Sequence, residues 1–284
     1  HRRSFLWREP LHPLLQHRLP DTHEQQALFR SPTVGLLRLL VADHLVKGQI
    51  IFPAAGYLEI ARAAFAAVSP SSEGVALRFV HFLSPLLVDD AAWVECALLQ
   101  DGSFEVRSDV AGDSPVHCSG QIEAAEAGMW QSAQLAEVQP RCGVSTDVTA
   151  LYAALAEVGL QYGPAFRRVE AAWTDDGTCA VGRLLRRRQR HGTKVHPADL
   201  DSALQLSVTL RGGKLDTIRL PFAIEAARMR SDVLRQPWAV LETAGTDATN
   251  VSLTDMSGAN QAQLEGFSTR AVRGSIGTRS QHLY

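Results

Sequence analysis

Apolar residues recur at helical spacing in two segments, and these segments organise the whole sequence. In the first, positions 57, 60, 61, 64, 65 and 68 follow the three- and four-residue steps of one helix face. Pro53 precedes this segment and Ala is frequent within it, so we predict a buried helix over Ala54–Val68. The second segment, at about residues 200–210, is also largely apolar and is predicted to end near Gly212 and Gly213.

Short runs of strand-like composition follow each predicted helix, bounded by Gly, Asp, Ser or Pro. After the first helix they cover residues 75–88, 92–99, 104–110 and 116–124. After the second they cover residues 217–225, 238–243, 250–255 and 263–271. Between the two sets, a helix is predicted at residues 147–158 with Thr146 as its N-cap, followed by strands at 169–173 and 179–185.

The order of elements therefore repeats, although no stretch of sequence does: one long apolar helix and then several strands, twice. A helix buries its apolar surface against one face of an antiparallel sheet. We predict an α+β fold of two similar halves, residues 1–124 and 146–284. The segment 125–145 has mixed polarity and no sustained period, and is predicted to be the linker between them.

Length and composition limit the classes to which this protein can belong. A chain of 284 residues permits one large domain or two halves, and 45% hydrophobic with 20% charged residues excludes a disordered chain or a coiled coil. The formal charge of -2 argues against a nucleic-acid binder, and the chain has no run of 18 apolar residues for a membrane helix. Residues 1–7 lack both a starting Met and the apolar core of a signal peptide, so we expect a piece of a longer polypeptide.

The cysteines are scattered. No two of the four cysteines form a C-x2-C or C-x4-C pair, so the spacing indicates neither a zinc site nor a redox pair. They are Cys96, Cys118, Cys142 and Cys179. We interpret them as reduced core residues of a cytoplasmic protein.

The first candidate for chemistry is His44, which stands four residues before Gly48 and nine before Pro53. Gly48 permits a backbone conformation or a close approach that a side chain blocks, and Pro53 suits the first turn of a helix. A single His is more often structural than catalytic, but this one lies in a predicted loop that leads into the first helix.

The second candidate is the start of the second helix. Asp201 and Gln205 are four residues apart and share a helix face. A carboxylate at this place is either an N-terminal cap or a functional acid. Asp199 and Asp201 cannot point the same way, so one of them is expected to be a cap or to face solvent, and spacing does not decide which.

The third candidate is the sequence Tyr162-Gly163-Pro164, followed by Phe166, between a predicted helix and a predicted strand. On these residues alone, an ordinary Gly-Pro turn is the favoured interpretation.

In this order and at these spacings, the three segments resemble the dehydratase domains of modular polyketide synthases. Flanking matches extend the resemblance to nearly the whole chain: His12-Pro13-Leu14-Leu15, residues 52–59 and Leu220-Pro221-Phe222. The resemblance implies a double hotdog fold, in which a His from one half faces an Asp from the other across a substrate tunnel. By matching positions, it implies that His44 is the catalytic base and Asp201 the catalytic acid, since the family pattern leaves the position of Asp199 open.

The implied reaction is loss of water from a β-hydroxyacyl thioester on an acyl carrier protein, which gives an α,β-unsaturated thioester. A same-fold alternative is a dehydratase that also closes an oxygen heterocycle by intramolecular oxa-Michael addition, and a different alternative is a non-catalytic docking module. No metal or cofactor of the domain itself is implied, because the substrate arrives on the phosphopantetheine arm of the carrier. Other domains of the same multienzyme and a second copy in a homodimer are the remaining expected partners.

Further residues are expected to bind substrate. Tyr162 and Gln205 are expected to orient the substrate hydroxyl and Asp201, and backbone N–H groups near the start of the first helix to hold the thioester carbonyl. Substrate contact is also expected from the remaining motif residues: Gly48, Pro53, Gly163, Phe166 and Phe222.

Five arginines lie close together just before the Asp201 segment: Arg183, Arg186, Arg187, Arg188 and Arg190. A solvated basic loop is the simpler interpretation. The more specific hypothesis is a docking patch for an acidic carrier protein near the tunnel mouth.

Overall fold

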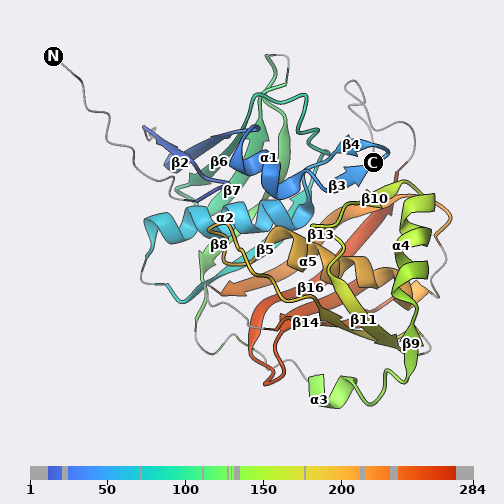
Figure 1. Ribbon diagram of the computed structural model, residues 1–284. Helices are drawn as coiled ribbons and strands as arrows, with labels where there is room; N and C mark the ends of the chain where they lie inside the picture. The colour runs from blue at the N-terminus through green and yellow to red at the C-terminus, as the bar shows by residue number, and fades with distance from the viewer. Residues whose placement is uncertain are drawn as a thin grey trace.

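Two central helices lie against one face of a single curved antiparallel sheet in the computed structural model (Figure 1). The structure describes residues 12–20, 25–70, 72–110, 112–126, 128, 130, 135–175, 177–211, 215–230 and 236–272. The N-terminal residues 1–7 and the glycines at 212 and 213 lie outside the described residues, so what we expect of them stays a prediction.

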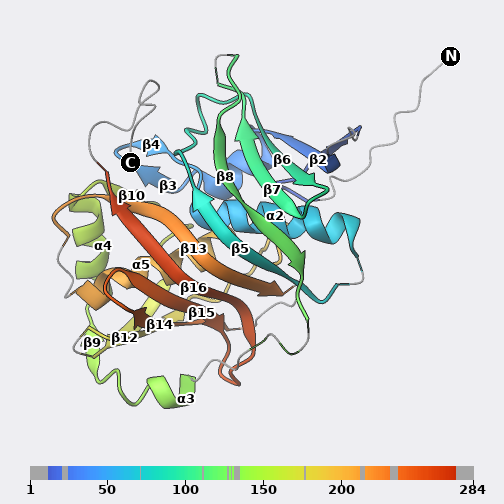
Figure 2. The same ribbon diagram turned by 180° about the vertical axis from the view of Figure 1, so that it is seen from behind.

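The described part of the sheet has thirteen strands, and its first six positions come from the N-terminal half. In spatial order these are β1 (His17–Leu19), β2 (Gln25–Pro32), β6 (Trp93–Leu99), β7 (Ser103–Ser108), β8 (Val116–Ala124) and β5 (Gly74–Phe82). The C-terminal half continues the same sheet with β13 (Arg219–Arg230), β16 (Asn260–Ala271), β15 (Ala248–Thr254), β14 (Trp238–Ala244), β12 (Cys179–Leu184), β11 (Val169–Thr174) and β9 (Val144–Thr146). The halves join where β5 pairs with β13, so that Leu77 lies opposite Ala227 (Figure 2).

The first central helix, α2 (Ala54–Val68), forms where the apolar spacing predicts it. Pro53 adopts an extended conformation at its N-cap, and every residue from 54 to 64 is buried. The helix contacts β5, β6 and β8 of its own half and α5 of the other half. The prediction of a buried helix over these residues is confirmed.

The second central helix, α5 (Pro197–Gln205), begins earlier than predicted and continues as a 3₁₀ helix over Leu206–Arg211. Pro197 lies in its first turn, and the Nδ1 atom of His196 accepts a hydrogen bond from the Ala198 N–H. The helix packs on β12, β14 and β15. Each half is thus one helix against its own part of the sheet, as in a double hotdog, and one apolar core runs through both halves.

Several elements differ from the sequence prediction. β1, β2 and α1 (Leu36–Val41) were not predicted, and His44 lies in a strand rather than a loop. The helix α4 (Val148–Glu157) is capped by Asp147, whose carboxylate accepts from two backbone N–H groups, so the prediction of Thr146 as the cap is wrong. The expected linker contains the short helix α3 (Leu135–Val138) and runs into β9, which pairs with β11.

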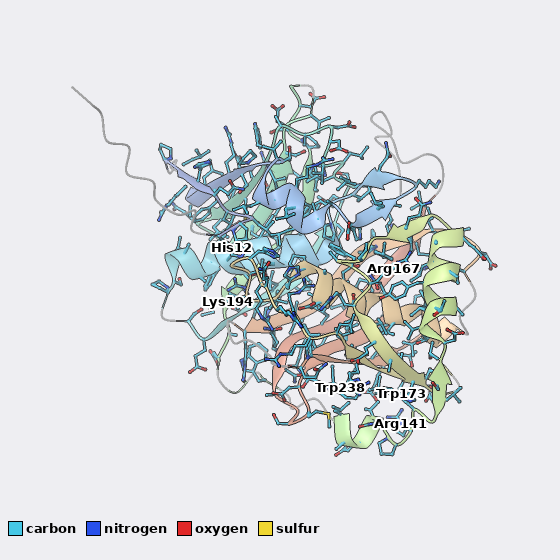
Figure 3. The ribbon with its side chains drawn as sticks, in the orientation of Figure 1. His12, Arg141, Arg167, Trp173, Lys194 and Trp238 are labelled. Carbon is cyan, nitrogen blue, oxygen red and sulfur yellow. The ribbon has the colours of Figure 1, made fainter. Side chains whose placement is uncertain are left out.

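A second apolar cluster lies on the far side of the C-terminal sheet, under α3. Trp173 and Trp238 stack there with ring centroids 6.2 Å apart, near Arg141 (Figure 3). The Sγ atoms of Cys142 and Cys179 are 2.7 Å apart, a proximity that the spacing does not reveal. All four cysteines are buried and free, as expected of reduced core residues. Among the described helices, none has the length and apolar character to span a membrane.

Candidate active site

His44 is carried by a tight hairpin made of β3 (His44–Val46) and β4 (Gln49–Ile50). Lys47 and Gly48 turn the chain with φ angles of 49° and 77°. Two successive positive φ angles are characteristic of the tightest hairpin turns and favour Gly. A Cβ atom on Gly48 would meet nothing within 4 Å, so Gly48 is explained by backbone conformation and not by close approach.

The environment of His44 decides which ring nitrogen is available. Its Nδ1 lies 2.7 Å from the carbonyl oxygen of Ile51, and a carbonyl only accepts, so Nδ1 carries the proton and donates. Nε2 therefore has a free lone pair in the neutral ring. The rings of Phe166 and Tyr162 lie 5.3 Å and 5.5 Å from the imidazole, and the side chain is only 7% exposed. His44 is therefore a buried imidazole whose Nε2 faces Asp201.

Asp201 faces His44 from the other half. Its Oδ1 lies 3.6 Å from His44 Nε2, and Gln205 Nε2 donates to its Oδ2 at 2.8 Å. Burial raises the pKa of the Asp201 carboxyl, while His44 and the Gln205 hydrogen bond oppose this rise. The two reactive atoms are too far apart for a good direct hydrogen bond, and the gap faces the pocket.

Asp199 has a different role from the one its position suggested. It is 2% exposed, and Arg187 Nη2 lies 2.8 Å from its Oδ1. It neither caps α5, a role taken by His196, nor faces solvent. The expectation that one of the two aspartates is a cap or exposed is wrong, because a buried ion pair satisfies Asp199.

The Tyr162-Gly163 turn is held by the residue next to the base. Tyr162 ends β10 (Leu160–Tyr162), which pairs with β3 so that Tyr162 lies opposite His44. The Asp43 carbonyl accepts from Gly163 N–H at 2.8 Å, and the Asp43 carboxylate accepts from Ala165 N–H at 2.7 Å. Any Cβ on Gly163 would collide with the Asp43 carboxylate, which explains the glycine. The turn thus ties the two halves together beside the base.

One open cavity is lined by His44, Asp201, Tyr162 and Gln205. The rest of its wall is mainly apolar and comes from both halves: Phe52, Tyr57, Leu155, Leu160, Leu204 and Leu220. Of the other predicted substrate contacts, Gly48, Pro53, Gly163 and Phe166 do not line the cavity. Gly48 lies in the hairpin turn, and Pro53 is the N-cap of α2. Gly163 lies in the turn bound by Asp43, and the Phe166 ring lies against His44.

Phe222, also predicted to contact substrate, does not line the cavity. Leu220 and Pro221 line it, but the Phe222 ring lies under the guanidinium of Arg270, 3.3 Å from its centroid. The pairing of β13 with β16 shifts register between Pro221 and Ala223, so the regular alternation of side chains is interrupted at Phe222.

The arginine cluster does not form one continuous basic surface. Arg187 is bound to Asp199, Arg183 pairs with Glu170 at 3.0 Å, and Arg190 Nη1 donates to the Lys194 carbonyl. Only Arg186 and Arg188 of the five are exposed. A docking patch built from all five is therefore reduced to these two exposed side chains.

A further buried carboxylate, Glu59 of α2, was not singled out by the sequence. It is fully buried and accepts from Arg62, from His12 and from the backbone N–H groups of Lys194 and Val195 (Figure 3). Lys194 and Val195 lie in the segment that leads into α5, so Glu59 links the two central helices. Both Glu59 and His12 lay inside the flanking matches, but nothing in the sequence paired them.

Tyr152 of α4 is a second residue that the sequence did not single out. Its hydroxyl donates to Gln205 Oε1 at 3.1 Å. It lies on the apolar face of a predicted helix, and no local pattern pairs it with Gln205, 53 residues away.

Comparison with known proteins decides the family. The protein-family model described as "Polyketide synthase dehydratase N-terminal domain" matches residues 131–279. A second family model, described as "Polyketide synthase dehydratase domain", matches residues 12–110. Polyketide synthase ThaG of Burkholderia thailandensis is 32% identical over 244 residues, which is 82% of this chain and 4% of that protein. The chain belongs to the polyketide synthase dehydratases. Polyketide synthase PksN of Bacillus subtilis is 30% identical over 94% of this chain and 5% of its own length.

Solved structures confirm the double hotdog. The dehydratase domain from the CurF module of Curacin polyketide synthase superposes with a TM-score of 0.81 and 26% identity, over 92% of this chain and 99% of that one. The dehydratase domain of RzxB from Pseudomonas fluorescens has the same TM-score at 24% identity, over 92% and 100%, and supports the fold alone. Polyketide synthase dehydratase domains are hydro-lyases that act on β-hydroxyacyl thioesters, and this chain is assigned to that class.

Proposed function

We propose that His44 and Asp201 of this dehydratase together remove water from a β-hydroxyacyl thioester. The observation that carries the proposal is the 3.6 Å approach of His44 Nε2 and Asp201 Oδ1 across an apolar cavity. The Ile51 carbonyl holds the Nδ1–H of His44 and leaves Nε2 to accept a proton, and burial favours the protonated form of Asp201. A non-catalytic docking module has no need of such an arrangement.

The elimination is balanced by two proton transfers. His44 Nε2 takes a proton from the α-carbon, and the electron pair of that C–H bond forms the new double bond. The C–O bond at the β-carbon breaks, and the leaving hydroxide takes the proton from Asp201 Oδ1 and departs as water. The imidazolium and the carboxylate then stand side by side, and one proton transfer between them restores the resting state.

The thioester carbonyl gains negative charge as the α-proton leaves. At the start of α2, the N–H groups of Gly56 and Tyr57 are already bonded to the Pro53 carbonyl. The N–H groups of Ala54 and Ala55 are our candidates for holding the carbonyl, because Ala54 lines the cavity and the helix dipole adds positive potential. Tyr162 and Gln205 are proposed to orient the hydroxyl and Asp201.

Two structures of a related domain support the assignment of a His and an Asp. For the dehydratase domain from the CurK module of Curacin polyketide synthase, 26% identical to this chain, a His-to-Phe and an Asp-to-Asn variant are each described as inactive mutants.

The setting of the reaction is also part of the proposal. Loss of water changes no oxidation state, so the proposed chemistry needs no redox cofactor. The acyl group is proposed to arrive on the phosphopantetheine of an acyl carrier protein, within a cytoplasmic multienzyme and a homodimer. The halves 1–124 and 146–284, joined by 125–145, are proposed to be inactive when separated, because each supplies one of the two reactive groups.

The test compares His44→Phe with His17→Phe, a control at an exposed position of β1. With a β-hydroxyacyl thioester, the wild type and the control should yield the product that has lost one water, and His44→Phe should not while keeping its melting temperature. Turnover by His44→Phe would overturn the assignment. A substrate with a distal hydroxyl extends the test, because chromatography separates a linear enoyl product from a cyclised isomer of equal mass.

A further inference from the structure

The two oxygens of Asp201 are chemically different in this site, and the difference originates at Gln205. Gln205 Nε2 donates to Asp201 Oδ2 at 2.8 Å and to the Phe166 carbonyl at 3.1 Å. A carbonyl has no proton to give, so the Phe166 oxygen fixes the nitrogen of the amide on this side. Gln205 is 4% exposed, so its amide depends on protein partners.

The opposite end of the same amide is fixed by Tyr152. The Val169 N–H donates to the Tyr152 oxygen at 3.2 Å, and the Tyr152 hydroxyl lies 3.1 Å from Gln205 Oε1. A phenol has a single proton, which is then directed to Gln205. Burial raises the pKa of Tyr152 to about 12, so the hydroxyl keeps this proton at neutral pH.

The bonds therefore run in one direction, from Val169 N–H through the Tyr152 hydroxyl and the Gln205 amide to Asp201 Oδ2. Hydrogen bonds in such a chain polarise one another and strengthen the last donation. Because Oδ2 already accepts a hydrogen bond, a proton on Asp201 belongs on Oδ1, the oxygen that faces His44.

We propose that Tyr152 is a positioning residue for the dehydration: through Gln205 it keeps the acidic proton of Asp201 on Oδ1. The proposal rests on the proposed function, in which Oδ1 delivers that proton to the leaving hydroxide. Tyr152 itself does not line the cavity and has no contact with substrate.

The other groups around Asp201 do not replace this contribution. His44 faces Oδ1 from β3, and Tyr162 faces the carboxyl from β10. The Arg167 guanidinium lies 5.5 Å from the centre of the Tyr152 ring, and its Nε donates to the Tyr162 carbonyl (Figure 3). Arg167 thus supports the ring, while the hydroxyl acts on Gln205.

A double-mutant cycle tests the chain of bonds. Tyr152→Phe should lower kcat about three- to tenfold with little change in KM, since one buried hydrogen bond is lost and the cavity wall is kept. In a Gln205→Leu background, the same substitution should have a much smaller effect, because the hydrogen-bonded route to Asp201 is gone. An equal loss in both backgrounds, or no loss in either, overturns the proposal.

A titration separates this proposal from the proposed function. The ¹³C signal of the Asp201 carboxyl, assigned by its loss in Asp201→Asn, should titrate at higher pH in Tyr152→Phe, because the hydrogen bond that favours the ionised form is weakened. Ser108→Ala is the control: it removes a comparable buried bond, to His117, away from the cavity. It should lower the melting temperature without moving the Asp201 titration. An unmoved titration in Tyr152→Phe overturns the positioning role, whereas an inactive wild type with the expected titration overturns only the proposed function.

Discussion

Glu59 and Asp201 are both buried carboxylates on the central helices of a hotdog half, yet their surroundings act on them in opposite directions. Burial alone raises the pKa of each. For Glu59, Arg62 and His12 outweigh burial and lower the pKa to about 2. For Asp201, the His44 imidazole and one hydrogen bond from Gln205 do not outweigh burial, and the pKa remains raised.

The difference lies in the number of donors. Glu59 accepts from two side chains and two backbone N–H groups, so its charge is fully compensated and it serves to hold the fold. Asp201 has one oxygen bonded to Gln205 and the other turned to the cavity. A buried acid with an unsatisfied oxygen is costly to stability and available for proton transfer.

The largest effect should come from Asp201→Asn, which keeps the shape and removes the proton donor. We expect kcat to fall about 100- to 10,000-fold, the usual contribution of a general acid. The raised pKa means that the ionised form is less favourable in the folded state, so stability falls as pH rises from the ordinary Asp value through the raised one. The Asn variant escapes this penalty and should melt no lower than wild type at pH 7. A marked drop in its melting temperature would contradict the comparison.

Glu59→Gln should lower stability strongly and activity only weakly, the opposite of Asp201→Asn. The variant leaves Arg62 buried without its charge partner, so we expect the free energy of unfolding to fall by about 3 kcal/mol or more. Activity measured well below the melting temperature should fall less than tenfold, because Glu59 does not touch the cavity. Urea unfolding and steady-state kinetics on the same preparation check both parts. A variant as stable as wild type would show that the four donors do not stabilise the fold.

The pH dependence of stability provides a second test of the difference between Glu59 and Asp201. The pKa of Glu59 is lowered from 4.5 to about 2, so its contribution is complete above 4.5 and is lost as pH falls towards 2. This shift corresponds to roughly 3 kcal/mol. The difference in unfolding free energy between wild type and Glu59→Gln should therefore shrink between pH 5 and pH 2. A difference that stays constant over this range would mean that shape, and not charge, explains the loss.

His117 should add a dependence of similar size at higher pH. Burial lowers its pKa from 6.5 to about 4, so the stability it contributes is present above 6.5 and is lost as pH falls towards 4. A His117→Gln variant should reduce the wild-type loss of stability between pH 6.5 and 4. The remainder should come from His196, whose pKa burial lowers to about 2. Thermal melts at half-unit pH steps check this, and an unchanged slope would show that His117 is not the group responsible.

The sequence predicted the reactive pair but not the network that supports it. The spacing from His44 to Pro53 runs through a single hairpin to the start of α2, and the four-residue step from Asp201 to Gln205 lies within α5, so both are local patterns. The contacts of Glu59 with His12 and with Lys194 join positions 47 and 135 residues apart. No local period encodes such a contact, because it depends on how two helices pack.

Departures from the prediction have the same origin. Phe222 belongs to a recognisable motif, but the register shift at this point of β13 leaves its ring against Arg270 and not on the cavity wall. One of Asp199 and Asp201 was expected to be a cap or exposed because the two cannot point the same way on a helix, whereas Asp199 is buried and paired with Arg187, twelve residues away. Helices, most strands and the two-half organisation follow from patterning, and the partners of buried charges follow from tertiary packing alone.

The smallest effect on stability is expected for exposed arginines, whose charges are solvated by water. Arg187 is 9% exposed and paired with Asp199, so its substitution should destabilise the fold, as with Glu59. Arg186 and Arg188 are exposed. Reversing both, as Arg186→Glu with Arg188→Glu, should leave the melting temperature and the turnover of a small soluble thioester unchanged.

If these two arginines meet an acidic carrier protein, the same variant should raise KM for a carrier-bound substrate several-fold, and added salt should produce a similar rise in wild type. Arg78→Glu, at an exposed position on β5 of the other half, is the matched control and should affect neither substrate. Equal behaviour of both variants toward the carrier-bound substrate would reject docking at residues 186 and 188. Such a result would not affect the comparison of stability, in which substitution of the buried Arg187 destabilises the fold and substitution of the exposed Arg186 and Arg188 does not.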